Sequence, residues 1–252
     1  MTRAWLATAL WAVLLGPCGA HADDLGGAGF ALPPMPSWND AQPRLLVQLR
    51  AVGAPHAPDA LFREDIPETR TILVLTPKDG EAMARDVTAD QAAGWGQEPD
   101  RLFERAIANL ERRFPPQVHQ TPELRRGVRV TLLYGDHPYA AGYALSIAKR
   151  ARCLGRAGAL VAIPSQHAML CYPIQSSRAY HGYLALVTLA VDIEERGDDP
   201  IVPHVYWYHA GAWETQPVTV EGKRFDHERS PGFSKLLKDL PRDIHDPRPR
   251  RW

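Results

Sequence analysis

The chain has 252 residues, with 29 Lys and Arg against 29 Asp and Glu, so its formal net charge is zero with His neutral. This balance argues against binding to nucleic acid through bulk positive charge. Hydrophobic residues make up 45% and charged residues 23%, which excludes a chain that is disordered throughout or collagen-like.

The N-terminal 22 residues have the three parts of a secretory signal peptide. Arg3 gives the positive start, and residues 4–15 form an apolar run that is too short to span a bilayer. Residues 20–22, Ala-His-Ala, place small residues at the two positions that a signal peptidase reads. We therefore expect residues 1–22 to be removed by cleavage near Ala22, which leaves a periplasmic or secreted mature chain.

The cysteines support a reading in terms of export. Cleavage removes Cys18 and leaves Cys153 and Cys171, which in an oxidising compartment are candidates for a disulfide. Two buried thiols are the alternative. For the leader, a lipoprotein signal at Cys18 and a buried N-terminal helix remain open. No segment of the mature chain is long and apolar enough to span a membrane, because the richest, residues 183–191, has the length of a core helix.

The composition divides the mature chain into three parts. Residues 23–43 are rich in Gly and Pro without periodicity, so we expect a flexible lead-in. Residues 44–221 are punctuated regularly enough for one domain. Residues 222–252 are charged and broken by prolines, and we interpret them as a solvated C-terminal tail.

Within the central part, the apolar pattern predicts alternating strands and helices. A β-branched run at 71–75 ends in a Pro-Lys-Asp-Gly turn, which predicts a hairpin with residues 81–88. Residues 99–113 place apolar side chains on one helical face. The other expected elements are strand 128–134, helix 140–153, strands 159–163 and 168–173, a core helix from Ser176 or Ser177 to Arg196, and strands 204–208 and 213–220.

This order, ββ-α-β-α-ββ-α-ββ, favours the α+β class. We expect a single domain in which a largely antiparallel, mixed sheet packs with about three helices.

Three stretches of sequence carry a family resemblance. They are 71–79 with Trp95-Gly96 and Leu102-Phe103-x-x-Ala106-x-x-Asn109-Leu110, then Gly135-Asp136 leading into Tyr143-Ala144-x-Ser146, and finally Leu160-Val161-Ala162-Ile163-Pro164-Ser165. Together with the order of elements, they make about residues 70–195 similar to the uncharacterised YtpQ-like family of bacterial proteins. That family has Arg and Asp where this chain has Gln166 and His167. The resemblance therefore implies a fold and carries over no activity.

Asp136 and His137 are the candidate catalytic residues. They lie at the C-terminal end of a predicted strand, in a loop before a helix, where sheets commonly place functional groups. A carboxylate near an imidazole raises the pKa of the imidazole and favours acid–base chemistry near neutral pH. The structural alternative is that Asp136 serves only as a turn or capping residue before Pro138.

Other histidines and motifs point to chemistry only weakly. Ser165 and His167 share one turn, and turn formation explains that Pro-Ser pair without a nucleophile. His204 and His209 are five positions apart and would point to opposite faces of a strand, so we expect no metal site. The G-x-S-x-G, H-E-x-x-H, phosphate-loop and G-x-G-x-x-G motifs are absent.

Aromatic residues gather in the last predicted hairpin. Trp207 is expected to point inward, with Tyr206, Tyr208 and His204 on the opposite, outward face. Trp213 belongs to the same cluster. Exposed aromatic rings stack on sugars, peptides or other proteins, whereas rings on the inner face are simply core. His204, Tyr206 and Tyr208 are therefore the candidate binding residues.

These observations favour an exported domain that binds an envelope protein or ligand without catalysis. We expect no cofactor, no metal and no nucleic-acid partner. The alternative is an envelope hydrolase or transferase that uses Asp136 and His137, which would need a concave pocket with convergent polar groups.

Overall fold

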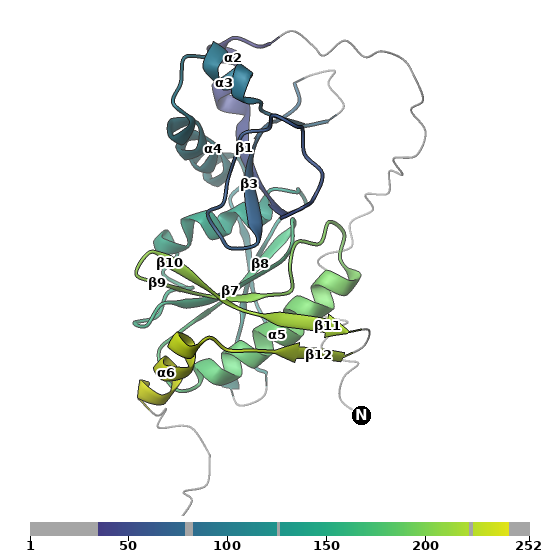
Figure 1. The fold of residues 1–252 in the computed structure, drawn as a ribbon. Coiled ribbons are helices and arrows are strands. Elements are labelled where there is room, and N and C mark those ends of the chain that lie inside the picture. The colour runs from purple at the N-terminus through teal and green to yellow at the C-terminus, as the bar shows by residue number, and fades with distance from the viewer. Residues whose placement is uncertain (1–34, 79–82, 125–126, 222–223, 242–252) are drawn as a thin grey trace, which may run out of the picture.

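The computed structural model describes residues 35–78, 83–124, 127–221 and 224–241 (Figure 1). The expected signal peptide, residues 1–22, lies outside the described residues, as do residues 23–34 of the lead-in and 222–223 and 242–252 of the expected tail. Helices and antiparallel strands both contribute to the described part, which confirms the α+β class.

The elements, in chain order, are α2 (Trp38–Ala41), the 3-10 helix η1 (Gln42–Arg44), β1 (Leu45–Ala51), β2 (Phe62–Arg63), β3 (Thr69–Leu75), β4 (Arg85–Asp86), α3 (Ala89–Gly94), α4 (Pro99–Arg113), β5 (Gln117–Gln120), β6 (Thr131–Tyr134), the 3-10 helix η3 (Ala140–Lys149), β7 (Ala159–Ser165), β8 (Ala168–Pro173), α5 (Ala179–Arg196), β9 (Val205–His209), β10 (Ala212–Gln216), β11 (Val218–Glu221), β12 (Arg224–His227) and α6 (Pro231–Asp239).

The N-terminal part is a small antiparallel sheet that carries α4 on one side (Figure 1). Its strands follow the order β1-β3-β2, and β4 also pairs with β3. Helix α4 has the predicted bounds, with Pro99 in its first turn and an apolar face against the sheet. The amide of Asn109 donates to the carbonyls of Gln42 and Leu45 at 2.7 and 3.0 Å, which fixes the helix to the start of β1.

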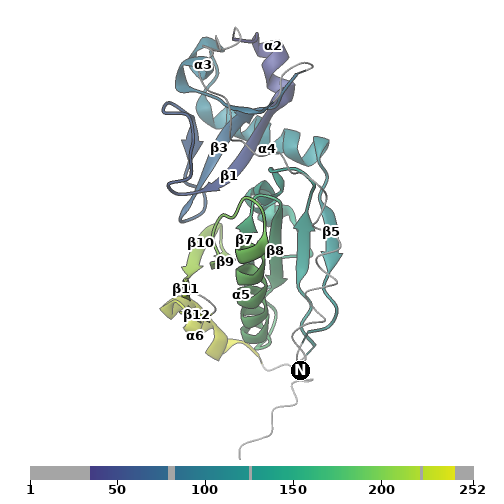
Figure 2. The same ribbon diagram turned by 90° about the vertical axis from the view of Figure 1, so that its right-hand side faces the viewer.

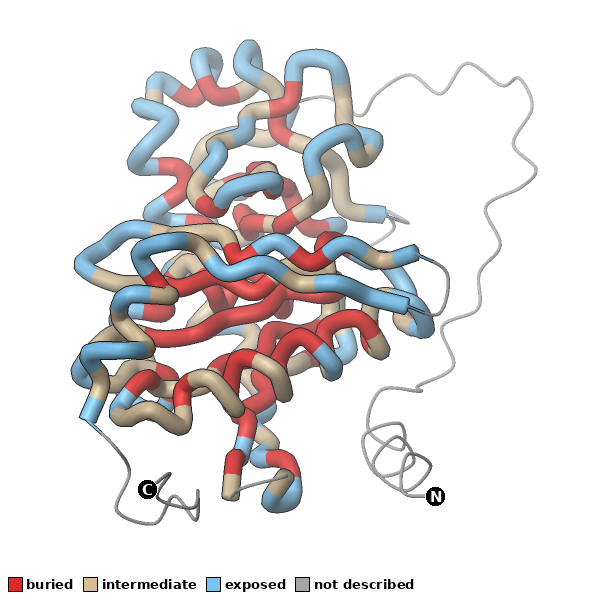
Figure 3. The backbone as a smooth tube through the Cα atoms, turned by 60° about the horizontal axis from the view of Figure 1, so that its bottom comes forward, coloured by how far each residue is buried: buried red, intermediate tan, exposed pale blue. Residues whose placement is uncertain are grey.

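The larger sheet has six strands in the order β10-β9-β7-β8-β6-β5, and every neighbouring pair is antiparallel. Helix α5 lies along one face, while η3 and the small sheet lie on the other (Figures 1 and 2). Because side chains alternate along a strand, Val161 and Tyr206 enter the core beside η3, whereas Leu160 and Trp207 enter the core beside α5. Both faces of the central strands are therefore buried (Figure 3).

A disulfide joins Cys153 to Cys171, with their Cα atoms 5.5 Å apart. Cys153 follows η3, and Cys171 lies in β8. The bond confirms the expected pairing, and it ties the end of the η3 segment to the middle of the larger sheet.

The C-terminal segment differs from the expected solvated tail. Strand β12 pairs with β11, and Ser230 caps α6 by accepting a hydrogen bond from the N–H of Phe233 at 3.1 Å. Phe233 is fully buried, and three leucines that follow at helical spacing pack against the same core: Leu236, Leu237 and Leu240. The expectation of a tail is therefore wrong for residues 224–240, because this helical spacing outweighs the surrounding prolines and charges.

Three local expectations are also corrected. Residues 35–43 are not all flexible lead-in, because α2 begins after Ser37, whose hydroxyl accepts from the N–H of Asp40. The expected strand 213–220 is interrupted at Pro217, which lacks a backbone donor, and so it divides into β10 and β11. The expected helix 140–153 is a 3-10 helix that ends at Lys149, and Ser146 within it leaves helical dihedral angles.

The core helix α5 begins slightly later than expected. Arg178 occupies its N-cap in place of Ser176 or Ser177, and the predicted end at Arg196 before Gly197 is confirmed. No helix in the described ranges is long and apolar enough to cross a membrane.

Candidate functional site

His137, one of the two candidate catalytic residues, is enclosed by aromatic rings. It lies in the loop between β6 and η3, and its ring centroid is 4.5 Å from Phe114, 5.8 Å from Tyr139 and 6.2 Å from Tyr143. Burial lowers the pKa of His137 below its ordinary value of 6.5, although Asp136 opposes that shift. Asp136 itself is exposed and forms no hydrogen bond or ion pair with the residues that the structure describes.

Both ring nitrogens of His137 have partners. The backbone N–H of Tyr139 donates to Nδ1 at 3.3 Å. The hydroxyl of Tyr143 donates to the carbonyl of Phe114 at 2.8 Å, so its oxygen accepts from Nε2–H of His137 at 3.2 Å. Burial, with Glu111 nearby, raises the pKa of Tyr143 to about 12 and keeps this hydroxyl protonated. A general base needs a free ring nitrogen, and here neither nitrogen is free.

The turn between β7 and β8 lies beside the His137 loop. The N–H of Gly135 donates to the carbonyl of His167 at 3.1 Å, which brings together two loops that the sequence only placed separately. Ser165 accepts from the backbone N–H of His167 at 3.3 Å, while the imidazole Nε2 lies 3.4 Å from Asp199 Oδ2. Ser165 and His167 therefore form a turn and not a nucleophile with its base.

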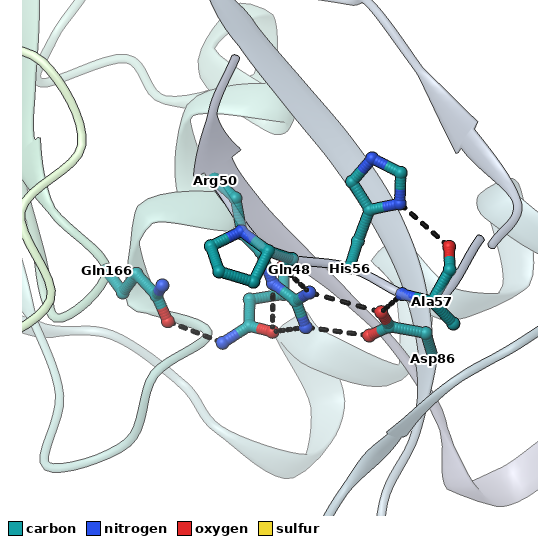
Figure 4. A network of polar contacts seen from close by, with 7 residues as sticks. Gln48, Arg50, His56, Ala57, Asp86 and Gln166 are labelled. Carbon is teal, nitrogen blue, oxygen red and sulfur yellow. Dashed lines mark hydrogen bonds and ion pairs between the residues drawn. The ribbon is translucent and has the colours of Figure 1, made fainter. Parts of the chain in front are cut away.

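A polar network joins this turn to the small sheet (Figure 4). Arg50 meets both carboxylate oxygens of Asp86 at 2.7 and 3.1 Å and donates twice to Gln48 Oε1 at 2.7 and 3.0 Å. Its remaining N–H donates to the carbonyl of Pro55 at 2.8 Å, so all five guanidinium donors are used. The amide of Gln48 donates in turn to Gln166 Oε1. The network holds the two sheets together and is not a binding site, because its donors already have partners within the protein.

The candidate binding face on β9 is not exposed. Tyr206 is fully buried, and its hydroxyl donates to the carbonyl of Pro67 at 2.9 Å. Tyr208 is half-buried, and His204 precedes β9 with its Nε2 2.9 Å from Glu68 Oε2. The expectation of an outward face is wrong because the small sheet and the residues that precede β3, Pro67 and Glu68, cover that side of β9.

A different surface of the protein offers the exposed candidate binding site that the sequence analysis expected on β9. A hollow of about 200 Å³ opens beside the disulfide and is lined by Val118, Thr131, Leu133 and residues 149–153. We call this site the basic hollow. Its floor is the outer end of the larger sheet, where β5 forms the edge (Figure 2), and Val118 is 44% exposed.

The wall of the basic hollow is cationic. Arg150 is held by Glu111 and donates to the carbonyl of Tyr143 at 3.1 Å, which orders the start of the wall. Lys149 and Arg152 are exposed and form no ion pair with any residue described by the structure. The signal for this wall is present in the sequence, because residues 149–156 hold four basic side chains and no acidic one.

Within the described ranges no group of three metal-ligating side chains is found. No family model, no curated protein and no solved structure matches the chain. We therefore interpret the site from its own geometry.

Proposed function

We propose that the protein is an exported, non-catalytic binding module of the cell envelope. The basic hollow is the observation that carries this proposal. It combines exposed apolar surface at Val118 with the exposed cations Lys149 and Arg152, a combination typical of interaction sites.

Export is supported by two independent features. The leader sequence has the charge, apolar run and small residues of a signal peptide. The Cys153–Cys171 disulfide fits an oxidising compartment, because cytosolic thiols are normally kept reduced. We infer a periplasmic or secreted location after cleavage near Ala22. Membership of the YtpQ-like family belongs to the same proposal and adds a fold without an activity.

A binding role is favoured over the hydrolase or transferase that would use Asp136 and His137. Such an enzyme needs His137 to accept a proton, yet Nδ1 and Nε2 are both engaged in hydrogen bonds. The aromatic enclosure also lowers the pKa of His137, which makes the neutral ring a weaker base.

Site-specific photo-crosslinking in the host cell tests the proposal. A photo-reactive residue is placed at Arg152 in the hollow wall and, as a matched control, at exposed Lys235 on α6, on the other side of the larger sheet. We expect an adduct with an envelope component at Arg152 and none at Lys235, in protein recovered from the periplasm with Asp23 at its N-terminus.

Two results would contradict the proposal. One is recovery of an intact Met1 form in the cytoplasm. The other is the absence of adducts at Arg152 together with substrate turnover that is lost in His137→Ala.

A further inference from the structure

Among the residues that the structure describes, β5 has a neighbouring strand on one side only. Strand β5 pairs with β6 and is the last strand in the order of the larger sheet. The N–H of Thr121, directly after β5, donates to the carbonyl of Val130 at 3.0 Å, which sets the phase of the ladder. Because hydrogen-bonded pairs alternate along antiparallel strands, Gln117 and His119 bond to β6, whereas the backbone groups of Val118 and Gln120 point outward.

An outward row of N–H and C=O groups is a template for one more strand. Cross-strand pairing places the Val118 side chain on the same face as Leu133, and this face is the floor of the basic hollow. A strand added to β5 would therefore place every second side chain beside the hollow.

The charges around this edge determine which charge the side chains of an added strand should carry. The residues of β5 are Gln, Val, His and Gln, without a carboxylate. Lys149 and Arg152 stand exposed on the wall, and Arg156 is exposed beyond the disulfide. Opposite charge at a rim accelerates association and excludes wrong partners, so the favoured strand carries acidic side chains.

The disulfide makes the wall a fixed feature. Cys153 ends the wall, and Cys171 lies in β8, so the bond tethers the backbone at the end of the wall to the sheet. A preorganised wall lowers the conformational entropy that is lost on binding.

We propose that β5 and the basic hollow together bind an acidic, extended peptide segment of a partner protein, which pairs with β5 as an additional strand. This inference rests on the proposed binding function and names the chemistry of its ligand. An anionic membrane surface would satisfy Lys149 and Arg152 but not the outward backbone groups of Val118, so a peptide fits the site better.

Fluorescence anisotropy with a labelled synthetic peptide of alternating Glu and Val tests the inference, with alternating Lys and Val as the control probe. We expect the protein to bind the Glu-Val peptide and not the Lys-Val peptide. The Lys149→Glu/Arg152→Glu double variant should weaken binding of the Glu-Val peptide by about tenfold or more, whereas Lys235→Glu/Lys238→Glu, an equal change of charge at two exposed positions on α6, should leave it unchanged.

The edge itself is tested at Val118. Val118→Pro removes an outward N–H that β6 does not use, and proline is tolerated on sheet edges, so the fold should persist while peptide affinity falls by about tenfold. Val118→Thr keeps the N–H and the β-branched shape and should keep the affinity. If Val118→Pro unfolds, as circular dichroism would show, the charge variants decide the question.

Three results would overturn the inference: no binding of the Glu-Val peptide, equal binding by Val118→Pro in its folded state, or binding to phosphatidylglycerol vesicles in place of the peptide. Crosslinked adducts at Arg152 without peptide binding would reject the acidic-strand ligand alone. Absence of the Arg152 adducts together with substrate turnover that is lost in His137→Ala would reject the proposed binding function itself.

Discussion

The two ends of η3 use their polar groups in opposite ways. Near its start, the two ring nitrogens of His137 and the hydroxyl of Tyr143 all form hydrogen bonds with neighbours inside the protein. At its end, Lys149 and Arg152 are exposed and unpaired within the described residues. The first region holds the candidate catalytic pair, yet the His137 ring is held by neighbours inside the protein and Asp136 is exposed without a partner among the described residues, so polar side chains at a strand end do not by themselves indicate a reactive site.

The largest expected effect concerns the Cys153–Cys171 disulfide, which ties the segment after η3 to the larger sheet. The Cys153→Ala/Cys171→Ala double variant should lose about 3 kcal/mol of unfolding free energy, because the unfolded chain regains the entropy of an open loop. Urea unfolding followed by circular dichroism measures this loss. A midpoint that does not move, with an unchanged slope, would mean that the bond does not constrain the chain.

A somewhat smaller loss is expected at the other end of η3. His137→Ala removes two hydrogen bonds and the packing against three rings, and should cost about 2–3 kcal/mol. Arg152→Ala is the matched change at the exposed end and should stay within about 0.5 kcal/mol. Equal losses in the two variants, measured by thermal unfolding, would erase the contrast between the regions.

The smallest of the three effects is a pH dependence. His137 has a folded-state pKa below its unfolded value of 6.5, so the unfolded chain binds a proton more readily. Its contribution to stability is therefore complete above that unfolded value and is lost as pH falls from there toward the lowered folded-state pKa. Unfolding curves at about pH 7.5 and about pH 5.5 should show this drop. His137→Phe should reduce it, and an unchanged drop in that variant would assign it to other groups.

Much of the larger sheet and the two long helices, α4 and α5, could be predicted from local sequence signals. Helix α4 has one apolar face and a proline at its start, and β7 and β8 are short apolar runs separated by a turn. These signals are local. Strand β1 was not predicted, because Val47 is the one β-branched residue among its seven and leucines do not favour strands over helices.

The candidate site depended on contacts that are distant in sequence. Tyr206 was expected to face outward, but its exposure is decided by Pro67, which lies on a segment far from it in the chain. The state of His137 likewise depends on Phe114, at the end of α4. The basic run at 149–156 was visible in the sequence, but its position beside Val118 follows only from the order of strands.

The burial of Phe233 imposes a timing constraint on folding. Its ring lies 5.9 Å from Trp207 and 5.7 Å from Tyr183, so α6 completes the core on the α5 side of the larger sheet. A chain that emerges N-terminus first, from a ribosome or a translocation channel, presents this apolar face before α6 is available. Such a partly folded chain is prone to aggregation, and we expect a chaperone to find its binding site on that face.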